Sequence, residues 1–562
     1  MPQTTAEHHV PGIDILVDGA KLDPQWRDLT LEVKVVDSLT LPDMAMVRLS
    51  DPQGEHIDNH PLQLGKTLEI KAAAKGERAT QLIFKGQIAA VEPEFTAKGC
   101  IISIRAYDQA HKLNRQRKTR TFQNVSASDM VRKIAGENGL QAQVESTSVV
   151  HEFFQQSNET DWDFCWRLAL MHDYEVVVRD NKLHFRKANK TENTTSLTWQ
   201  DNLVSFRPRI SGVQQPQTVD IRAWDPKNKQ AITVSASNPT TSSQPGVDRR
   251  QVASALGGGR TAIADRVAAD NGEAKALAES TLQRMADAFY EADGLAFGTP
   301  EIKASSQVEV KGVGSKFGGK FTVTSATHSY RGTTGYMTAF QISGRSSRTL
   351  LELMRPPKER DWSADLVVGV VTNNNDPMEI GRVRVKYPSL SDSEESAWAR
   401  VATPSTGNAR GLLMLPQVGE EVIIGFEHGD TRRPIVIGSV FNGRDKPGAD
   451  LLQNRDGSFA VLSNEKIHQH AKKDFVIKSD QNMTVEIKQD EKHTVKGGYT
   501  HETTGAGKLK AQTYTVEAGS SMTVKGASVT VEASAALTLK GATVDIQGSG
   551  PVNIKGAIIN IG

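Results

Sequence analysis

Carboxylates that could perform hydrolysis occur where two β-rich regions of the chain are joined. Asp445, Asp450, Asp456 and Glu465 follow one another closely, and a pair of carboxylates is what a glycosidase needs to cleave a cell-wall polymer. The interval from Lys446 to Asn482 is, at about 40 residues, too short for a domain with a core of its own. We therefore interpret these side chains as solvated linker charges and predict no catalytic residue.

The histidines show no spacing typical of a metal site. His493 and His501 are isolated in the sequence, His8-His9 lies near the start of the chain, and His328 falls on a predicted strand, where a structural role is expected. The sequence Gly257-Gly258-Gly259-Arg260 lacks the Lys-Ser/Thr pair of a phosphate-binding loop. We therefore predict no bound metal and no cofactor.

The basic run from Arg115 to Arg120 is the strongest local concentration of charge. It contains none of the interleaved aromatic residues that stack on nucleic-acid bases. The whole chain carries 67 basic and 66 acidic residues, so its bulk charge gives no support for binding to nucleic acid or to a membrane surface. We interpret the run as an exposed ridge, or as a surface between subunits that faces acidic partners, and predict no nucleic-acid ligand.

Cysteine content and the N-terminal sequence bear on where the chain is made. Cys100 and Cys165 are too few for a disulfide framework and fit synthesis in a reducing compartment. Residues 1–11 contain neither the basic nor the apolar segment of a signal peptide. No apolar run approaches the roughly 18 residues that a membrane-spanning helix requires. The sequence predicts a soluble protein that is made in the cytoplasm without a signal peptide.

A short repeat organises the residues from Met522 to Gly562. Apolar–polar–apolar triplets start at intervals of seven or eight residues, and Lys-Gly recurs every 15 residues. In an extended strand both apolar members of a triplet point to one face, and the glycines permit sharp bends. Six triplets make about two coils of a single-chain solenoid, fewer than the roughly three repeats that it needs. We therefore predict three identical chains wound into a stiff needle, with their strand edges closed between chains.

The triplets predict both the buried core of this trimeric needle and its tip, a blunt platform without a metal-binding histidine pair. The predicted core positions are Val524, Val529, Val531, Leu537, Leu539, Val544 and Ile546. The predicted tip positions are Val552, Ile554, Ile559, Ile561 and Gly562.

The rest of the sequence predicts β-rich domains with a few inserted helices. Alternating strands between Ile13 and about Tyr107 indicate a barrel. Capping sequences at Ser126–Asp129 and Asn158–Asp161 begin two helices, and Glu273–Tyr290 forms a third. Leu366 to about Asn442 contains five short strands over about 80 residues, which suits an OB-type barrel.

Several motifs in this order resemble the VgrG family of spike proteins from contractile injection systems. The segment Asn158–Val178 resembles the family's hub signature, with Glu159, Asp161, Phe164, Arg167, Leu168 and Tyr174 at the matching positions. Trp224-Asp225-Pro226 and the stretch Phe317–Phe340 also follow its pattern. The OB region matches at Leu415–Val422, Gly425-Phe426, Gly429-Asp430, Arg433-Pro434, Ile437-Gly438 and Phe441-Asn442.

The resemblance implies a mainly β protein with some α structure. We expect a phage-hub-like domain at 1–355 (two β-barrel subdomains with inserted helices) and an OB-fold domain at 364–445. A linker at 446–482 and a needle at 483–562, a triple-stranded intertwined β-helix or prism, would follow. It further implies a homotrimer whose hub forms a pseudo-hexameric ring. The implied partners are the inner tube protein, baseplate proteins, a PAAR-repeat tip protein, effector cargo and, on firing, the target-cell membrane.

The particle type is the finest distinction that the resemblance suggests. Tyr107–Leu113 and Arg117–Ile134 look more like spikes of extracellular, phage-tail-like systems than like type VI secretion spikes or phage baseplate hubs, which are the alternatives. Such a chain would be assembled in the bacterial cytoplasm, within a released or membrane-docked particle, and translocated on contraction. The alternatives of other classes are an envelope-degrading peptidoglycan hydrolase and a carbohydrate- or nucleic-acid-binding OB module.

Overall fold

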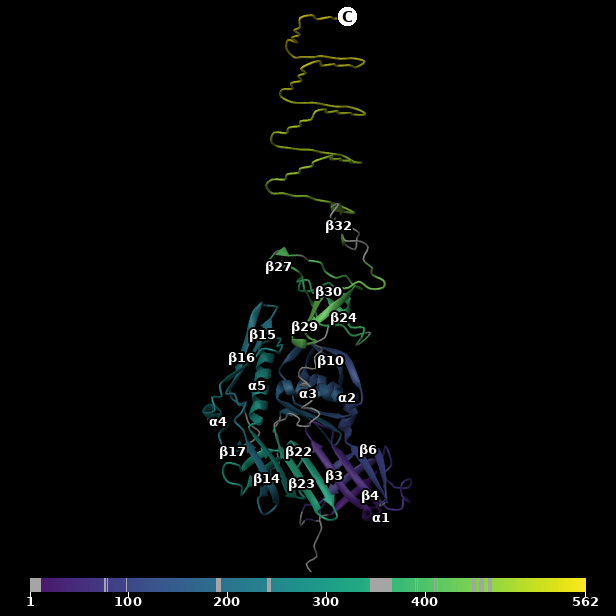
Figure 1. The fold of residues 1–562 in the computed structure, drawn as a ribbon, viewed down its shortest axis with the longest axis vertical. Helices are drawn as coiled ribbons and strands as arrows, with labels where there is room; N and C mark the ends of the chain where they lie inside the picture. The colour runs from purple at the N-terminus through teal and green to yellow at the C-terminus, as the bar shows by residue number, and fades with distance from the viewer. Residues whose placement is uncertain are drawn as a thin grey trace, which may run out of the picture. The chain divides into compact units, whose positions relative to one another are not determined.

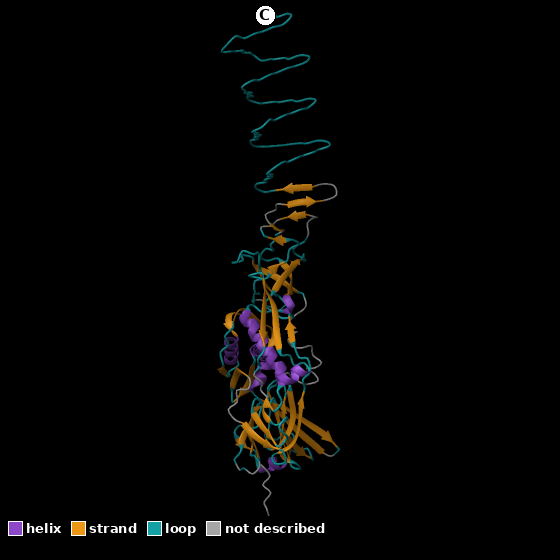
Figure 2. Ribbon diagram, turned by 90° about the vertical axis from the view of Figure 1, so that its left-hand side faces the viewer, coloured by secondary structure: helices purple, strands orange, loops and turns teal. Residues whose placement is uncertain are grey.

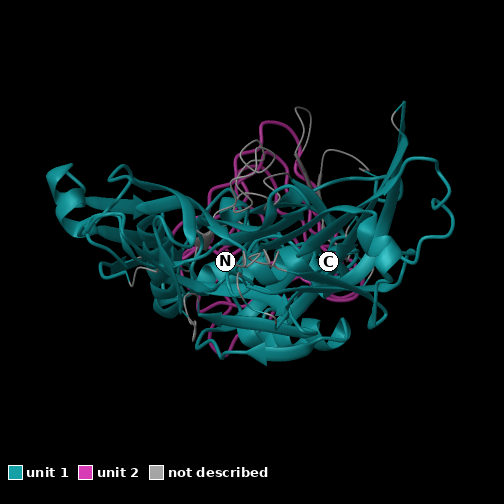
Figure 3. Ribbon diagram, turned by 90° about the horizontal axis from the view of Figure 1, so that it is seen from below, with its two compact units in different colours: residues 1–451 teal, residues 452–562 magenta. Residues whose placement is uncertain are grey.

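The computed structural model describes residues 12–74, 77, 79–97, 99–187, 194–239, 244–343, 366–389, 391, 393–408, 410–411, 413–446, 451–453, 459–462 and 467–562. The chain divides into two compact units, Met1–Leu451 and Leu452–Gly562 (Figure 3). Within the described ranges, no helix is long and apolar enough to cross a membrane. His8-His9, Asp450, Asp456 and Glu465 lie outside the described residues.

An 11-stranded sheet forms a half-barrel that dominates the first unit (Figure 1). Its strand order is β14-β19-β23-β22-β3-β4-β7-β6-β5-β1-β2. Strands β22 and β3 pair antiparallel, with Ser325 opposite Ser38, so strands from the two halves of the predicted hub join in one sheet. The strands are β1 (Ile13–Val17), β2 (Ala20–Lys21), β3 (Thr30–Ser38), β4 (Met44–Asp51), β5 (Thr67–Ala72), β6 (Gln81–Thr96), β7 (Gly99–Tyr107), β14 (Leu203–Ile210), β19 (Tyr290–Phe297), β22 (Ser325–Arg331) and β23 (Gly335–Ile342).

The alternation of apolar residues sets which face of this sheet is buried. In β4, Ala45, Val47 and Leu49 are fully buried, and Ile102 and Ile104 of β7 pack in the same core. Successive side chains of a strand point to opposite faces, so this alternation fixes the register of each strand. The short helix α1 (Pro24–Asp28) contributes Trp26 to the same core.

A second layer is built around two helices, and both predicted caps are confirmed. Ser126 and Asp129 form a reciprocal capping box at α2, and Thr160 caps α3. Asp180 and Asn181 have positive φ values of 47° and 62°, which suits a two-residue hairpin turn. The elements are η1 (Gln109–Asn114), β8 (Arg117–Ser126), α2 (Ala127–Glu137), β9 (Gln141–Val144), β10 (Val150–Thr160), α3 (Asp161–His172), β11 (Tyr174–Arg179) and β12 (Lys182–Lys187).

The third of the predicted helices is α5 (Asn271–Asp287), which lies against a small sheet of strands β16-β15-β18 (Figure 1). Leu277 and Leu282 of α5 share a core with Val219 and Ile221 of β15. The remaining elements of this region are β13 (Thr194–Thr198), β15 (Thr218–Asp225), β16 (Gln230–Ala236), β17 (Gln244–Pro245), α4 (Arg249–Ala255), β18 (Arg260–Ile263), β20 (Gln307–Lys311) and β21 (Gly319–Thr322).

The OB region contains the five strands that the sequence predicts, in the order β25-β24-β29-β30-β26. Val385, Val422 and Val436 form its fully buried core. A small hairpin of two further strands was not predicted. The strands are β24 (Val367–Asn373), β25 (Arg384–Lys386), β26 (Arg400–Val401), β27 (Thr406–Gly407), β28 (Arg410–Gly411), β29 (Glu421–Phe426) and β30 (Pro434–Ser439), and η3 (Glu427–Gly429) precedes β30.

The second unit begins with a three-stranded sheet and continues as an extended, regularly bent chain. The sheet contains β31 (Leu451–Gln453), β32 (Phe459–Leu462) and β33 (Ile467–His470). From residue 471 onward the chain forms no strand ladder with itself, and it winds as a repeated zigzag (Figure 2). Its bends begin at residues 472, 480, 488, 496, 504, 512, 519, 527, 534, 541, 549 and 557.

This spacing shows that the repeat is longer than the sequence alone indicated. Bends recur every seven or eight residues from residue 472, some 50 residues before Met522. The regular winding thus includes residues that we assigned to the linker. The apolar triplet side chains are exposed in the single chain, for example Val531 at 66% and Ile546 at 65%. The intertwined trimeric prism itself stays a prediction.

Candidate functional site

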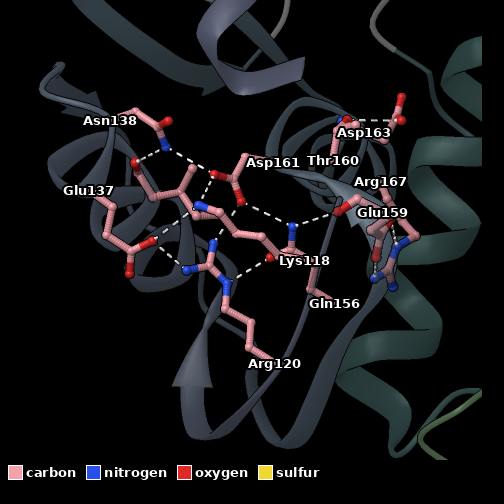
Figure 4. Close-up of polar contacts among 11 residues, drawn as sticks. Lys118, Arg120, Glu137, Asn138, Gln156, Glu159, Thr160, Asp161, Asp163 and Arg167 are labelled. Carbon is pink, nitrogen blue, oxygen red and sulfur yellow. Dashed lines mark hydrogen bonds and ion pairs between the residues drawn. The ribbon is translucent and has the colours of Figure 1, made fainter. Parts of the chain in front are cut away.

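A buried polar network lies at the point where β8, β10, α2 and α3 meet (Figure 4). Antiparallel pairing of β8 with β10 places Arg120 opposite Gln156. The first residue of α3, Asp161, has a side chain that is only 3% exposed. Its carboxylate accepts hydrogen bonds from Lys118 Nζ at 2.6 Å, Arg120 Nη2 at 2.8 Å, Asn138 Nδ2 at 3.0 Å and Gln156 Nε2 at 3.0 Å.

The charges of this network balance locally. Burial opposes the charge of Asp161, but the hydrogen bonds from Lys118, Asn138 and Gln156, together with the charge of Arg120, hold its pKa below the usual value. Glu137 on α2 pairs with Arg120 and, at 3.8 Å, with Lys118. The network therefore ties the start of α3 to α2 and to both strands of the β8–β10 pair.

A second charged pair of the hub signature lies on the other side of α3. Glu159 accepts two hydrogen bonds from Arg167, whose guanidinium also donates to the Gln155 carbonyl at 2.8 Å. The guanidinium carbon of Arg167 lies 4.9 Å from the ring centre of Phe154 and 5.0 Å from that of Phe164. This geometry combines a bidentate ion pair with cation–π contacts, so it fixes the orientation of α3.

The structure corrects the interpretation of the basic run as an exposed ridge at Lys118 and Arg120, whereas Arg115 and Arg117 are exposed. The Lys118 and Arg120 side chains are 31% and 15% exposed and are paired internally with Asp161. Arg117 donates to the backbone carbonyl of Asn158, at 3.1 Å. The sequence misled because the carboxylate that neutralises the run lies about 40 residues further along the chain.

Another buried ion cluster joins the OB region to the hub. Arg432 follows η3 and pairs with Asp430, at 2.7 Å, and with Glu273 at the start of α5. Its guanidinium carbon lies 5.1 Å from the ring centre of Phe154 on β10. Burial disfavours the charge on Arg432, but the carboxylates of Asp430 and Glu273 outweigh it and raise its pKa. Glu394 of the OB region also accepts a hydrogen bond from the Thr121 backbone N–H, at 2.8 Å.

A buried histidine, His151, and a half-buried one, His172, lie next to this joint. His151 Nδ1 is 3.9 Å from a carboxylate oxygen of Glu273, and the His151 and His172 ring centres are 6.2 Å apart. Burial, together with the proximity of His151, lowers the pKa of His172 to about 4. Both rings are therefore neutral at physiological pH and pack as aromatic groups beside the ion cluster.

Neither cluster has the geometry of a catalytic centre. Each cation described here is held by a carboxylate or a carbonyl, and no serine or cysteine nucleophile lies beside a base in either cluster. Within the described ranges, no three His, Cys, Asp or Glu side chains are grouped to hold a metal ion.

His328 is buried in β22, and its Nδ1 lies 2.7 Å from the Tyr336 hydroxyl. Arg260 of the Gly-rich segment pairs with Asp220 at 3.2 Å.

The hollows that the described residues of the first unit form include two without paired carboxylates. One, of about 410 Å³, is lined by uncharged polar residues and Arg250. The other, of about 190 Å³, lies between β15 and η3 and contains Trp224, Arg222 and Glu427. Glu427 is held by Arg400 at 3.1 Å.

The predicted needle residues are described by the structure but not brought together by one chain. Core positions such as Val529 and Leu537 are 54% and 55% exposed, and the tip residue Ile561 is 91% exposed. Sequence reasoning missed the Arg432 cluster altogether. Arg432 and Glu273 are 159 residues apart in the sequence, so no local spacing signals their contact.

Comparison with known families covers both the hub and the OB region. The model of the Alg8 N-terminal domain matches residues 7–331, which is more than half of the chain. The model of the type VI secretion system/phage-baseplate injector OB domain matches residues 367–441. The second match contains all five strands of the OB sheet.

Curated relatives are similar over a short segment only. The actin cross-linking toxin VgrG1 of Vibrio cholerae is 30% identical over 150 residues, which are 23% of this chain and 14% of the toxin. The type VI secretion system spike protein VgrG1c of Pseudomonas aeruginosa is 29% identical over 133 residues, which are 21% of this chain and 18% of that protein. The chain thus spans less than a fifth of the length of these relatives.

Solved structures of similar fold include injection and tail proteins. One is the Escherichia coli c3393 protein, described as a component of the type VI secretion system with similarity to the T4 bacteriophage tail proteins gp27 and gp5. It has a TM-score of 0.46 and 15% identity, over 76% of this chain and 100% of that chain. Another is the 43 kDa tail protein of prophage MuSo2 from Shewanella oneidensis, with a TM-score of 0.47 and 15% identity, over 60% and 98%.

Replacing Asp161 tests the polar network. Asp161→Asn leaves Lys118 and Arg120 without their buried counter-charge, and we expect a loss of about 3 kcal/mol in unfolding free energy near pH 7. Because the folded pKa of Asp161 is depressed, its stabilisation is present above about pH 4 and disappears as the pH falls through the folded pKa. Denaturant unfolding at several pH values measures this. The control Glu92→Gln, in an exposed pair with Arg105, should change stability by about 0.5 kcal/mol or less. An equal effect of both variants at pH 7 contradicts the proposed role.

Replacing Arg432 tests the joint between the OB region and the hub. Arg432→Leu leaves Asp430 and Glu273 as uncompensated buried charges, which costs about 3–5 kcal/mol. We expect faster hydrogen exchange at the start of α5 and at β30, measured by mass spectrometry. The exposed Arg444→Ala variant of the same region is the control. Unchanged exchange in Arg432→Leu would show that the cluster does not hold the joint.

Proposed function

Since this chain belongs to the Alg8 N-terminal domain family and to the VgrG family of spike proteins, we propose that it acts as the homotrimeric spike of a contractile injection machine. Its hub would connect the inner tube and the baseplate, its OB region would form a neck, and residues from about 472 onward would form the puncturing needle. The needle would carry a PAAR-repeat tip protein, and effector cargo would travel with it. Contraction of a sheath would drive it through a target-cell membrane.

The observation that carries this proposal is the bent, unpaired chain after residue 471. Its backbone groups have no ladder partners within one chain, and its apolar triplets are half or more exposed. Soluble proteins rarely leave so much apolar surface uncovered. Two further copies would bury the triplets and pair the open strand edges. A prism closed in this way has no loose loops, so it would resist bending under load.

The first unit offers two further features that support a trimer. Its half-barrel sheet ends at β14 and at the very short β2, so two edges are available for pairing with other chains. The OB region also exposes large apolar side chains, including Leu413 at 70%, Phe441 at 71% and Ile380 at 57%. Contacts between subunits would cover this surface.

The proposed role is structural rather than catalytic. The relatives named as spikes support this role, and the two ion clusters of the hub join elements of the fold. The toxin activity in the name of one relative belongs to that protein, of which 14% is matched. An envelope-degrading enzyme is the alternative, and a zymogram of the purified protein on peptidoglycan tests it, because clear lysis would overturn a purely structural role.

The particle type and the cellular location are proposed on the sequence features alone. We propose an extracellular, phage-tail-like particle, with a type VI secretion spike or a phage baseplate hub as alternatives. Assembly would take place in the bacterial cytoplasm, and the needle would leave the cell on contraction. Imaging of purified particles that carry this chain distinguishes a released particle from a membrane-anchored one.

A substitution on the apolar face of the needle tests the trimer. Val531→Asp places three carboxylates in the predicted core and removes an apolar contact worth about 1.5–3 kcal/mol per chain. We expect loss of protease resistance in the needle and a smaller fraction of trimer, measured by light scattering after size exclusion. Thr530→Asp changes the neighbouring residue on the opposite face of the same strand and is the matched control. Equal behaviour of the two variants would contradict the assignment of faces.

Removal of the last eleven residues tests the tip. Deleting residues 552–562 takes away Val552, Ile554, Ile559 and Ile561, so we expect that a PAAR-repeat protein no longer co-purifies. The mass of the trimer should be retained, because the hub and most of the needle are intact. Unchanged co-purification of the tip protein from this deletion would overturn the proposed platform.

A further inference from the structure

The bends between residues 472 and 512 give the lower needle an eight-residue frame. They begin at residues 472, 480, 488, 496, 504 and 512, so residues eight apart occupy equivalent places in successive segments. Alternate residues of an extended segment share a face. The fourth and sixth residues of each segment, with its first bend residue counted as the first, therefore form one continuous face. That face carries Phe475, Ile477, Met483, Val485, Glu491, His493, Tyr499, His501, Gly507 and Leu509.

The opposite face identifies which side would be solvated. Its residues are polar with one exception, Val476. They are Lys478, Thr484, Glu486, Lys492, Thr494, Thr500, Glu502, Lys508 and Lys510. The face that begins with Phe475 and Ile477 is therefore the one that points to the axis of the proposed trimer.

Polar, metal-ligating side chains interrupt this inner face in two successive segments. Glu491 and His493 occupy the places that Met483 and Val485 hold one segment earlier, and His501 follows His493 by one further segment. The structure confirms that Glu491 and His493 lie on one side, because His493 Nε2 is 2.6 Å from Glu491 Oε1. Apolar residues lie on the inner face before and after this polar layer. His493 and His501, isolated in the sequence, are thus aligned by the spacing of the bends.

A layer of polar side chains inside the needle raises its free energy unless these groups bind a partner. Polar side chains without partners in an apolar core lose their hydration, at a cost of about 1–3 kcal/mol for each group. Three chains would bring three imidazoles of each histidine toward one axis, together with three Glu491 carboxylates. Imidazole and carboxylate groups are the ligands of Zn²⁺ and of similar transition-metal cations. A dication would also offset part of the negative charge of the carboxylates.

We propose that the trimeric needle binds a divalent transition-metal ion on its axis, held by His501 from three chains, with His493 and Glu491 as the adjoining polar layer. The inference rests on the proposed trimer, because one chain does not group three such ligands within the described residues. The hydrogen bond that Glu491 accepts from His493 would orient the imidazole, as carboxylates orient imidazoles around metal sites. The ion would cross-link the three chains in the shaft of the needle, away from its tip.

The test uses the full chain without an affinity tag. The mass of the protein is measured first, and the protein is then dialysed against Zn²⁺ or Co²⁺ and its bound metal is quantified by plasma mass spectrometry. We expect about one ion per three chains, and Co²⁺ should show the visible absorption of a nitrogen-ligated site. A chelator should lower the temperature at which the trimer dissociates, because the ion binds only the assembled state.

Matched variants separate this site from adventitious binding. His501→Val places an apolar residue between Tyr499 and Leu509 on the inner face, so the trimer should persist while the bound metal falls to the level of the buffer. Thr500→Val alters the neighbouring residue on the solvated face and should retain the metal. A trimer that binds neither ion in this ratio, or that keeps its ion after His501→Val, overturns the metal site alone. A protein that is not trimeric overturns both the metal site and the proposed spike.

Discussion

Short extended segments that cannot bury their own apolar side chains are the constraint on which the rest of this molecule depends. Bends occur every seven or eight residues from residue 472 to the end of the chain, and most segments between bends carry two apolar residues on one face. A single chain leaves these residues half or more exposed, with no ladder of backbone hydrogen bonds. Neighbouring segments of one chain do not pair, so in the proposed trimer burial would come from the other copies. In the proposed spike, the hub and the OB region would hold identical chains in register where the needle begins.

Holding the chains in register requires a hub that does not yield under axial force. The two buried ion clusters would suit this role, because each connects elements that are distant in sequence. Asp161 ties α3 to α2 and to the β8–β10 pair, while Arg432 ties the OB region to α5 and β10. Buried ion pairs contribute little net stability, but removing one partner is strongly destabilising. They therefore favour one arrangement of these elements over others, which the proposed spike would require.

Local features of the fold were predictable because local chemistry decides them. The capping box at Ser126 and Asp129, the N-cap of α3 and the turn at Asp180-Asn181 each depend on a few adjacent residues. The five OB strands followed from alternating apolar residues between turns. The pairing of β22 with β3 did not follow, because strands almost 300 residues apart carry no mutual signal in one sequence. The exposed ridge predicted for Arg115–Arg120 was wrong at Lys118 and Arg120 for the same reason, since their carboxylate partner is remote.

The sequence by itself determined the period of the needle, the apolar character of one of its faces and the order of hub, OB region and needle. Period and alternation are properties of residues close together in the chain, so they can be recognised in the sequence alone. Only the tertiary structure decided which charges are buried, because burial depends on elements that fold together from distant parts of the chain. The structure also decided at which residue each repeat of the needle begins. The bends show that the repeat begins near residue 472 and that His493 and His501 share one frame, since the backbone records a bend where the side-chain pattern is irregular.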